Sequence, residues 1–142
     1  MGLFGWPFRA KPEREAGHSR LASRQSPTGS HSPSAARREV LQLALRESLQ
    51  RHGIPTSWIT ADALSATSRN SEAGLHWRLA IKHWDPRLML HGVALQHSLV
   101  NRVLMYDPRA HDWLLGISWQ FALPDESECP AMPHPGSWTA DP

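Results

Sequence analysis

The sequence predicts a small α+β domain with the element order αββαβ, in which a three-stranded sheet carries two helices on one face. Segments with helical apolar spacing interleave with segments of strand-like alternation, and Gly, Pro, Asn or Asp bounds each segment. The chain has 142 residues, 40% of them hydrophobic, which suffices for one core. We expect the domain over residues 35–123, with disordered tails at both ends.

The two ends differ from the middle in composition and charge. Residues 9–34 are dense in Ser, Pro, Gly, Arg and His, so we expect residues 1–34 to form a disordered basic head. Residues 1–38 hold seven Lys or Arg against two Glu, a net charge of +5. Residues 124–142 hold four acidic residues, five prolines and no Lys or Arg, so they are expected to form an acidic tail.

Capping signals mark two helices. Ser32 can cap the first helix, and Gly53 can end it in the left-handed conformation that glycine adopts at low cost. We expect this helix over roughly residues 34–52. Asp85 is the cap of a second helix, which runs to about Met105. A proline in the first turn follows each cap.

Three strands are expected, over residues 57–66, 75–83 and 113–123. A hairpin followed by a helical crossover favours a sheet in which the first strand lies between the other two. Strict alternation places the apolar side chains of the last two strands on the inward face. The side chains expected there are Leu75, Trp77, Leu79, Ile81 and His83, and Trp113, Leu115, Ile117, Trp119, Phe121 and Leu123.

Four histidines between residues 76 and 97 raise the question of a metal site. His76 and His83 are seven residues apart, so a regular strand points them to opposite faces. His91 and His97 are six residues apart, which places them about 120° apart around a straight helix. The spacing therefore predicts no metal site and no cofactor.

No motif for catalysis is present: the sequence lacks a P-loop, a G-x-G-x-x-G, an H-E-x-x-H and a G-x-S-x-G. Cys129, the only cysteine, lies in the acidic tail, where an activated thiol is not expected. Asp107, His111 and Asp112 could supply a general base, but turn capping accounts for them as well. We therefore expect a protein that is not an enzyme.

A sheet face that no predicted helix covers is the predicted partner-binding surface. Trp84 has the same outward parity as Arg78 and Lys82, which sets an aromatic ring beside two cations. Trp58 is assigned to the same surface. The alternative is that the C-terminal tail, with Trp138, covers this face.

Two residues of the second helix suggest a helix interface. Gln96 lies near the middle of the apolar arc, where a buried amide needs partners, and Gly92 lies one turn earlier, where another helix could approach closely. The alternatives are an amide bonded to nearby backbone, or a contact between subunits of a homo-oligomer.

The order αββαβ resembles, in topology alone, the ring-building modules of bacterial secretion systems and, more loosely, KH-type RNA-binding domains. The GxxG loop of the KH family is missing, because Gly74 and Gly92 each stand singly. We expect a non-catalytic protein–protein interaction module, an accessory or assembly subunit of a larger bacterial complex such as a secretion or surface-appendage system.

Two other functions stay open. The first is nucleic-acid binding through the basic head and one sheet face. The second is a histidine-based enzyme or a secreted effector. No segment is long and apolar enough to cross a membrane, and a lone cysteine suits a reducing compartment, so we expect a cytoplasmic protein.

Overall fold

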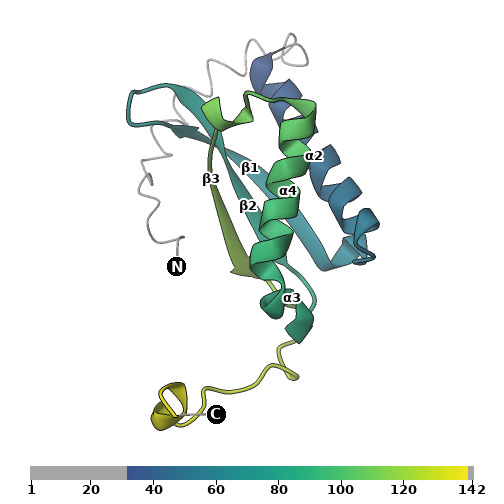
Figure 1. The fold of residues 1–142 in the computed structure, drawn as a ribbon, viewed down its shortest axis with the longest axis vertical. Helices are drawn as coiled ribbons and strands as arrows, with labels where there is room; N and C mark the ends of the chain where they lie inside the picture. Colours follow the sequence, from purple (N-terminus) through teal and green to yellow (C-terminus); the bar gives the residue numbers. More distant parts are fainter. Residues whose placement is uncertain (1–31, 141–142) are drawn as a thin grey trace.

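In the computed structural model, which describes residues 32–140, three strands form one mixed sheet of order β1-β2-β3 (Figure 1). The strands are β1 (Ile59–Thr67), β2 (Ala73–Ile81) and β3 (Leu114–Phe121), and the α-helices are α2 (Pro33–Arg51), α3 (Pro86–Leu90) and α4 (Gly92–Tyr106). Short 3-10 turns lie at η3 (Thr56–Trp58), η4 (Ala110–Asp112) and η5 (Pro135–Trp138). The predicted α+β class and αββαβ order are confirmed.

Both ends of the chain extend beyond this domain. The prediction of a disordered head falls on residues outside the described part, apart from residues 32–34, which cap and begin α2. Apart from η5, residues 124–140 contain no helix or strand, as their lack of periodicity predicts.

The predicted strand order is wrong, because β2 and not β1 lies at the centre. β2 pairs antiparallel with β1 and parallel with β3. Only β2 has a full row of buried apolar side chains, and a strand with neighbours on both edges is the one best placed to bury them. This row consists of Leu75, Trp77, Leu79 and Ile81, none of them more than 4% exposed.

Helix α2 begins and ends where the sequence predicts. The Ser32 hydroxyl accepts a hydrogen bond from the Ala35 backbone N–H at 3.1 Å. Gly53 takes a φ of +72°, and the Ile54 N–H then donates to the Leu49 carbonyl at 2.9 Å. Both ends of the helix are therefore fixed by local chemistry.

The second predicted helix is broken in two at His91. Asp85 caps it as expected, accepting from the Arg87 N–H at 2.9 Å. His91 then leaves helical geometry, with φ −107° and ψ 16°, and separates α3 from α4. Gly92, which has a low helix propensity, follows the break.

A β-bulge at Leu115 changes the alternation expected in β3. Leu75 pairs with Leu114 but His76 pairs with Gly116, so Leu115 is the extra residue. Leu114 packs against the core in the place predicted for Leu115.

Helices α2 and α4 cover the same face of the sheet, as Figure 1 shows. Together with the buried row of β2 they build one core. Its most deeply buried helical residues are Leu41, Ala44 and Leu49 of α2, and Leu99 and Val103 of α4.

Two glycines test the bulge directly. A Cβ at Gly74 would lie 2.5 Å from the Trp113 carbonyl oxygen and 2.7 Å from Leu115 Cγ, whereas a Cβ at Gly92 would meet nothing within 4 Å. We expect Gly74→Ala to lower the free energy of unfolding by roughly 1–3 kcal/mol. The matched Gly92→Ala variant should leave it unchanged or raise it by up to about 1 kcal/mol. Urea denaturation measures both, and equal effects would contradict the close approach at Gly74.

Candidate functional site

The sheet face opposite the helices carries only one of the four predicted partner-binding residues. Arg78 lies there and donates to Asp62 of β1 at 2.7 Å. On the same face His76 is hydrogen-bonded to Ser118 of β3 at 2.8 Å. Burial, and then the charge of Arg78, lower the pKa of His76. The polar groups of this face therefore pair largely with one another across the strands.

Lys82 and Trp84 leave the sheet, because β2 ends at Ile81. The strand alternation that was expected to place Trp84 beside Arg78 does not continue after Ile81. Lys82 is exposed, and its backbone N–H donates to the Trp58 carbonyl at 2.7 Å. Trp84 is half-buried in the turn that leads to α3. The structure therefore does not assemble the predicted surface of two cations and an aromatic ring.

Trp58 lies on the helix side, where it forms part of a pocket. Its ring stacks on His83 with 4.2 Å between ring centroids and 20° between the planes. It also packs against the core. Trp58 thus joins η3 to the Lys82–His83 segment, which leads toward α3.

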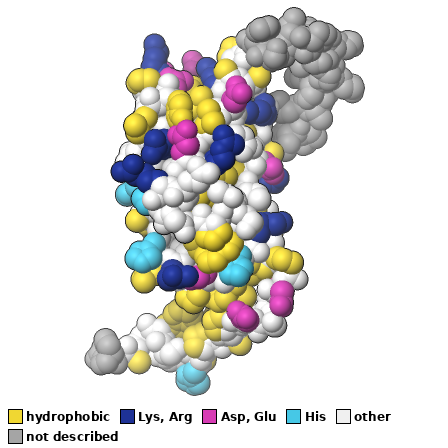
Figure 2. Space-filling view, turned by 90° about the vertical axis from the view of Figure 1, so that its right-hand side faces the viewer, with side chains coloured by type: hydrophobic (Ala, Val, Ile, Leu, Met, Phe, Trp, Pro, Cys, Tyr) yellow, Lys and Arg dark blue, Asp and Glu magenta, His cyan; other side chains and the backbone are white. Residues whose placement is uncertain are grey.

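This pocket lies between the end of α2, the turn η3, and the junction of α3 with α4. Its volume is about 630 Å³. The lining residues are His52, Gly53, Ile54, Pro55, Trp58, Arg87, Leu88, His91, Ala94 and Leu95. Figure 2, which looks onto the side that carries α2, shows hydrophobic side chains on the lower part of the body beside His, Lys and Arg side chains. An apolar floor with polar groups at its rim is typical of a binding site.

Cations outnumber carboxylates around the pocket. Arg87 is the one cation among its lining residues, and it is paired with Asp85. Two exposed cations adjoin lining residues: Arg51 precedes His52 in the chain, and the backbone N–H of Lys82 donates to the Trp58 carbonyl at 2.7 Å. The pocket therefore favours a ligand that brings negative charge with an apolar group.

Asp85 is held by Arg87. The Arg87 side chain donates from Nε to Oδ1 at 2.9 Å and from Nη2 to Oδ2 at 2.6 Å. These bonds, and then the Arg87 backbone N–H, lower the pKa of Asp85 from 3.8 to about 2. The same pair raises the pKa of Arg87. Asp85 thus caps α3 and fixes a cation at the rim of the pocket.

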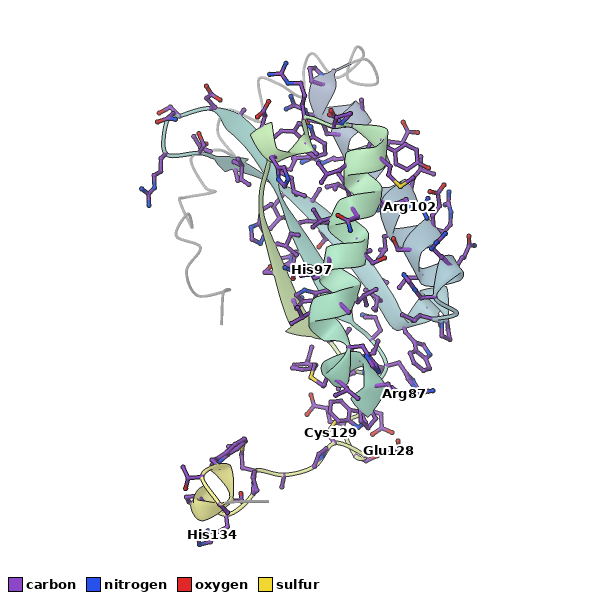
Figure 3. The ribbon with its side chains drawn as sticks, in the orientation of Figure 1. Arg87, His97, Arg102, Glu128, Cys129 and His134 are labelled. Atoms are coloured by element: carbon purple, nitrogen blue, oxygen red, sulfur yellow. The ribbon has the colours of Figure 1, made fainter. Side chains whose placement is uncertain are left out.

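The four histidines do not converge. His76 lies on the far sheet face, His83 stacks on Trp58, His91 lines the pocket, and His97 is exposed on α4 (Figure 3). Within residues 32–140 no three His, Cys, Asp or Glu side chains group closely enough to hold a metal ion.

His52 and Ser98 form the one contact at the pocket that resembles a catalytic pair. His52 Nε2 and Ser98 Oγ are 2.8 Å apart. Nucleophilic catalysis also needs a group that orients the histidine, and a carboxylate is the usual one. Among the described residues His52 has no ion pair with Asp or Glu. The pair joins α2 to α4 at the edge of the pocket.

The predicted helix interface has an intramolecular explanation for one of its residues. Gln96 Oε1 accepts a hydrogen bond from Trp119 Nε1 of β3 at 2.7 Å. The amide therefore ties α4 to the sheet, which neither of the two alternatives for it anticipates. Gly92 faces open space, with nothing within 4 Å of a Cβ built there.

Exposed apolar side chains surround the α3–α4 junction. Met89 is 48% exposed, Leu90 76% and Val93 74%. These three residues are here called the elbow patch. Large exposed apolar patches commonly mark interaction sites.

The acidic tail does not cover the sheet face opposite the helices. It leaves the domain at the end where α3 lies and extends away from the body (Figure 1). In Figure 3, Glu128 and Cys129 lie near the level of Arg87, whereas His134 lies well beyond it. Met132 is 80% exposed and Trp138 65%.

Sequence reasoning missed the pocket, although it named Trp58. The pocket exists because α2 ends at Gly53 and the second helix breaks at His91, which leaves a gap between two helix ends. Gly53, Pro55 and Gly92 are the sequence signals for these helix ends. The sequence does not show that the two ends meet in space.

No protein-family model matches this chain, and neither do the curated proteins or the solved structures with which it was compared. None of the helices in residues 32–140 is both long and apolar enough to span a bilayer.

The Asp85 cap should make stability fall in acid. Because the folded-state pKa of about 2 lies below the ordinary 3.8, the stabilisation is present above about pH 4 and is lost as the pH falls toward 2. Asp85→Asn keeps a capping oxygen but has no proton to take up. Its Tm should therefore drop less than that of the wild type between about pH 5 and pH 2.

Glu39→Gln is the matched control, since Glu39 is exposed on α2 and forms no ion pair within residues 32–140. Thermal melts followed by circular dichroism give the three profiles. Identical acid dependence in the wild type and Asp85→Asn would contradict the role assigned to the cap.

Proposed function

We propose that this chain is a non-catalytic protein–protein interaction module whose pocket receives an apolar side chain of a partner protein. The observation that carries the proposal is the open, largely apolar pocket of about 630 Å³ at the meeting point of two helix ends. Partner proteins commonly anchor themselves by inserting one large side chain into such a pocket.

The surroundings of the pocket favour a protein over a small molecule. The elbow patch, Met89, Leu90 and Val93, lies outside the pocket lining but exposes apolar surface at the same α3–α4 junction. A small molecule would bury the pocket and leave this surface exposed, whereas a polypeptide can cover both. Arg51 and Lys82, which are exposed beside the pocket, would lie near a bound partner, where charge speeds association and selects partners.

The same pocket supports binding better than catalysis. Its walls offer Ile54, Trp58 and Leu95, which bury a ligand but transfer no proton. The pair of His52 and Ser98 lacks an ion-paired carboxylate among the described residues. A site for general acid–base chemistry would need that further group.

The nucleic-acid alternative has less support. It depends on the basic head, most of which lies outside the described residues, and on cations free to meet phosphate. Arg78 is already engaged with Asp62 at 2.7 Å. Such a neutralised cation adds little to phosphate binding.

The biological setting is proposed from topology and composition. The resemblance to ring-building modules favours an accessory or assembly subunit of a larger bacterial complex. A single cysteine, Cys129, suits a reducing compartment, so we propose a cytoplasmic location.

Selection from a random peptide library tests the proposal. We expect the full-length protein to enrich peptides with an aromatic or aliphatic residue flanked by Asp or Glu. Ala94, which is exposed and lines the pocket, offers a way to block it. Ala94→Trp should weaken binding of the enriched peptides at least about tenfold, because the indole would occupy the space of the anchor.

Asn101→Trp is the matched control, as Asn101 is exposed on the same helix but does not line the pocket. Its peptide binding should equal that of the wild type. Enriched peptides that bind Ala94→Trp undiminished, or a selection that yields no peptide, would contradict the proposed function.

A further inference from the structure

The C-terminal tail carries two large apolar side chains that the domain leaves in solvent. Met132 is 80% exposed and Trp138 65%. Tryptophan is usually well buried, and exposed tryptophans are frequent at protein interfaces. The tail therefore has the side chains of a docking segment.

The tail presents Trp138 on a preformed turn. The Gly136 N–H donates to His134 Nδ1 at 2.9 Å, and Ser137 Oγ donates to the His134 carbonyl at 2.7 Å. These bonds fix η5, of which Trp138 is the last residue. A segment that is already ordered loses less conformational entropy when it binds.

The charge of the tail is opposite to that of the pocket. Residues 124–142 have four acidic residues and no Lys or Arg. Asp125, Glu126 and Glu128 are exposed, and none forms an ion pair within residues 32–140. Beside the pocket, Arg51 and Lys82 are exposed and form no ion pair within residues 32–140, whereas Arg87 of the lining is paired with Asp85. Each copy thus holds both halves of a complementary pair.

The direction of the tail favours docking between copies. It leaves the domain at the end where α3 lies and extends away from the body (Figures 1 and 3). Trp138 lies fifteen positions after Leu123, and an extended chain of that length reaches about 50 Å. That reach is enough for a neighbouring domain.

We propose that the C-terminal tail of one copy docks in the pocket of a second copy. Trp138 enters the apolar space beside Trp58 and Leu95, and the carboxylates of residues 125–128 lie near the cationic rim. The proposal rests on the function proposed for the pocket and names its occupant. Because tail and pocket are different surfaces of one chain, the contact either closes by exchange between two copies or continues around a ring.

Charge reversal in the full-length protein tests this contact. One variant reverses the pocket rim (Arg51→Glu with Lys82→Glu), and a second reverses the tail (Glu126→Lys with Glu128→Lys). All four residues are exposed and form no ion pair within residues 32–140, so both variants should fold. Circular dichroism checks this. Sedimentation equilibrium then measures the association of each variant alone and of an equal mixture.

We expect the wild type to self-associate, and each variant alone to do so at least about tenfold more weakly. The mixture should regain association, since reversed tails then meet reversed pockets. Trp138→Ala should weaken association by a similar factor, whereas Leu64→Ala, on the exposed surface of β1 and outside the pocket lining, should not.

Three results would overturn the inference. A wild type that is monomeric at all concentrations would mean that the tail folds back on its own domain or serves another partner. Association that survives Trp138→Ala would place the contact elsewhere. If each variant associates more weakly and their mixture does not regain association, the tail does not pair with the pocket. Peptides selected by the wild type and lost in Ala94→Trp would still uphold the function proposed for the pocket, so the two failures are distinguishable.

Discussion

The burial of one apolar row on β2 is the constraint on which the rest of the structure depends. Almost no solvent reaches the side chains of this row, Leu75, Trp77, Leu79 and Ile81. Their burial requires a strand on each side of β2 and two helices above it. β1 supplies one neighbour through the hairpin. The α3–α4 connection supplies the other by returning the chain to run parallel with β2. Helices α2 and α4 then share one sheet face and bury Leu49, Leu99 and Val103 against the row.

The pocket follows from how these two helices end. Gly53 ends α2, after which the chain passes through η3 into β1, while the break at His91 separates α3 from α4. Trp58 lies between these two helix ends, where it packs against the core and stacks on His83. Apolar surface is thus left open at one end of the domain, where no other element of residues 32–140 covers it. The acidic tail leaves the domain at the same end.

Local chemistry made much of the fold predictable. The caps at Ser32 and Asp85 and the end of α2 at Gly53 each depend on a few neighbouring residues. The alternation of β2 is visible in its own sequence, without knowledge of the strands that pair with it. The strand order was not predictable in the same way, because it depends on which strand has the most apolar surface to bury. Nor was the bulge at Leu115, which needs the register of two strands.

The candidate site was less accessible to sequence reasoning than the fold. Parity along β2 placed Arg78 correctly on the outward face but failed for Trp84, since the strand ends before it. Trp58 is the one predicted residue that lines the pocket. The pairing of Gln96 with Trp119 joins two residues from separate elements, and no pattern within either segment indicates it. The proposed docking of one copy's tail in the pocket of another can be tested with a spin label on Cys129, the only cysteine. Burial and the neighbouring carboxylates raise the pKa of that thiol, so labelling needs alkaline buffer. Labelled protein is mixed with isotope-labelled Cys129→Ser protein, and the amide signals of the second copy are recorded. We expect the signals of His52, Trp58 and His91 to broaden, while those of the far sheet face stay sharp. Unbroadened pocket signals at concentrations where the protein self-associates would contradict it.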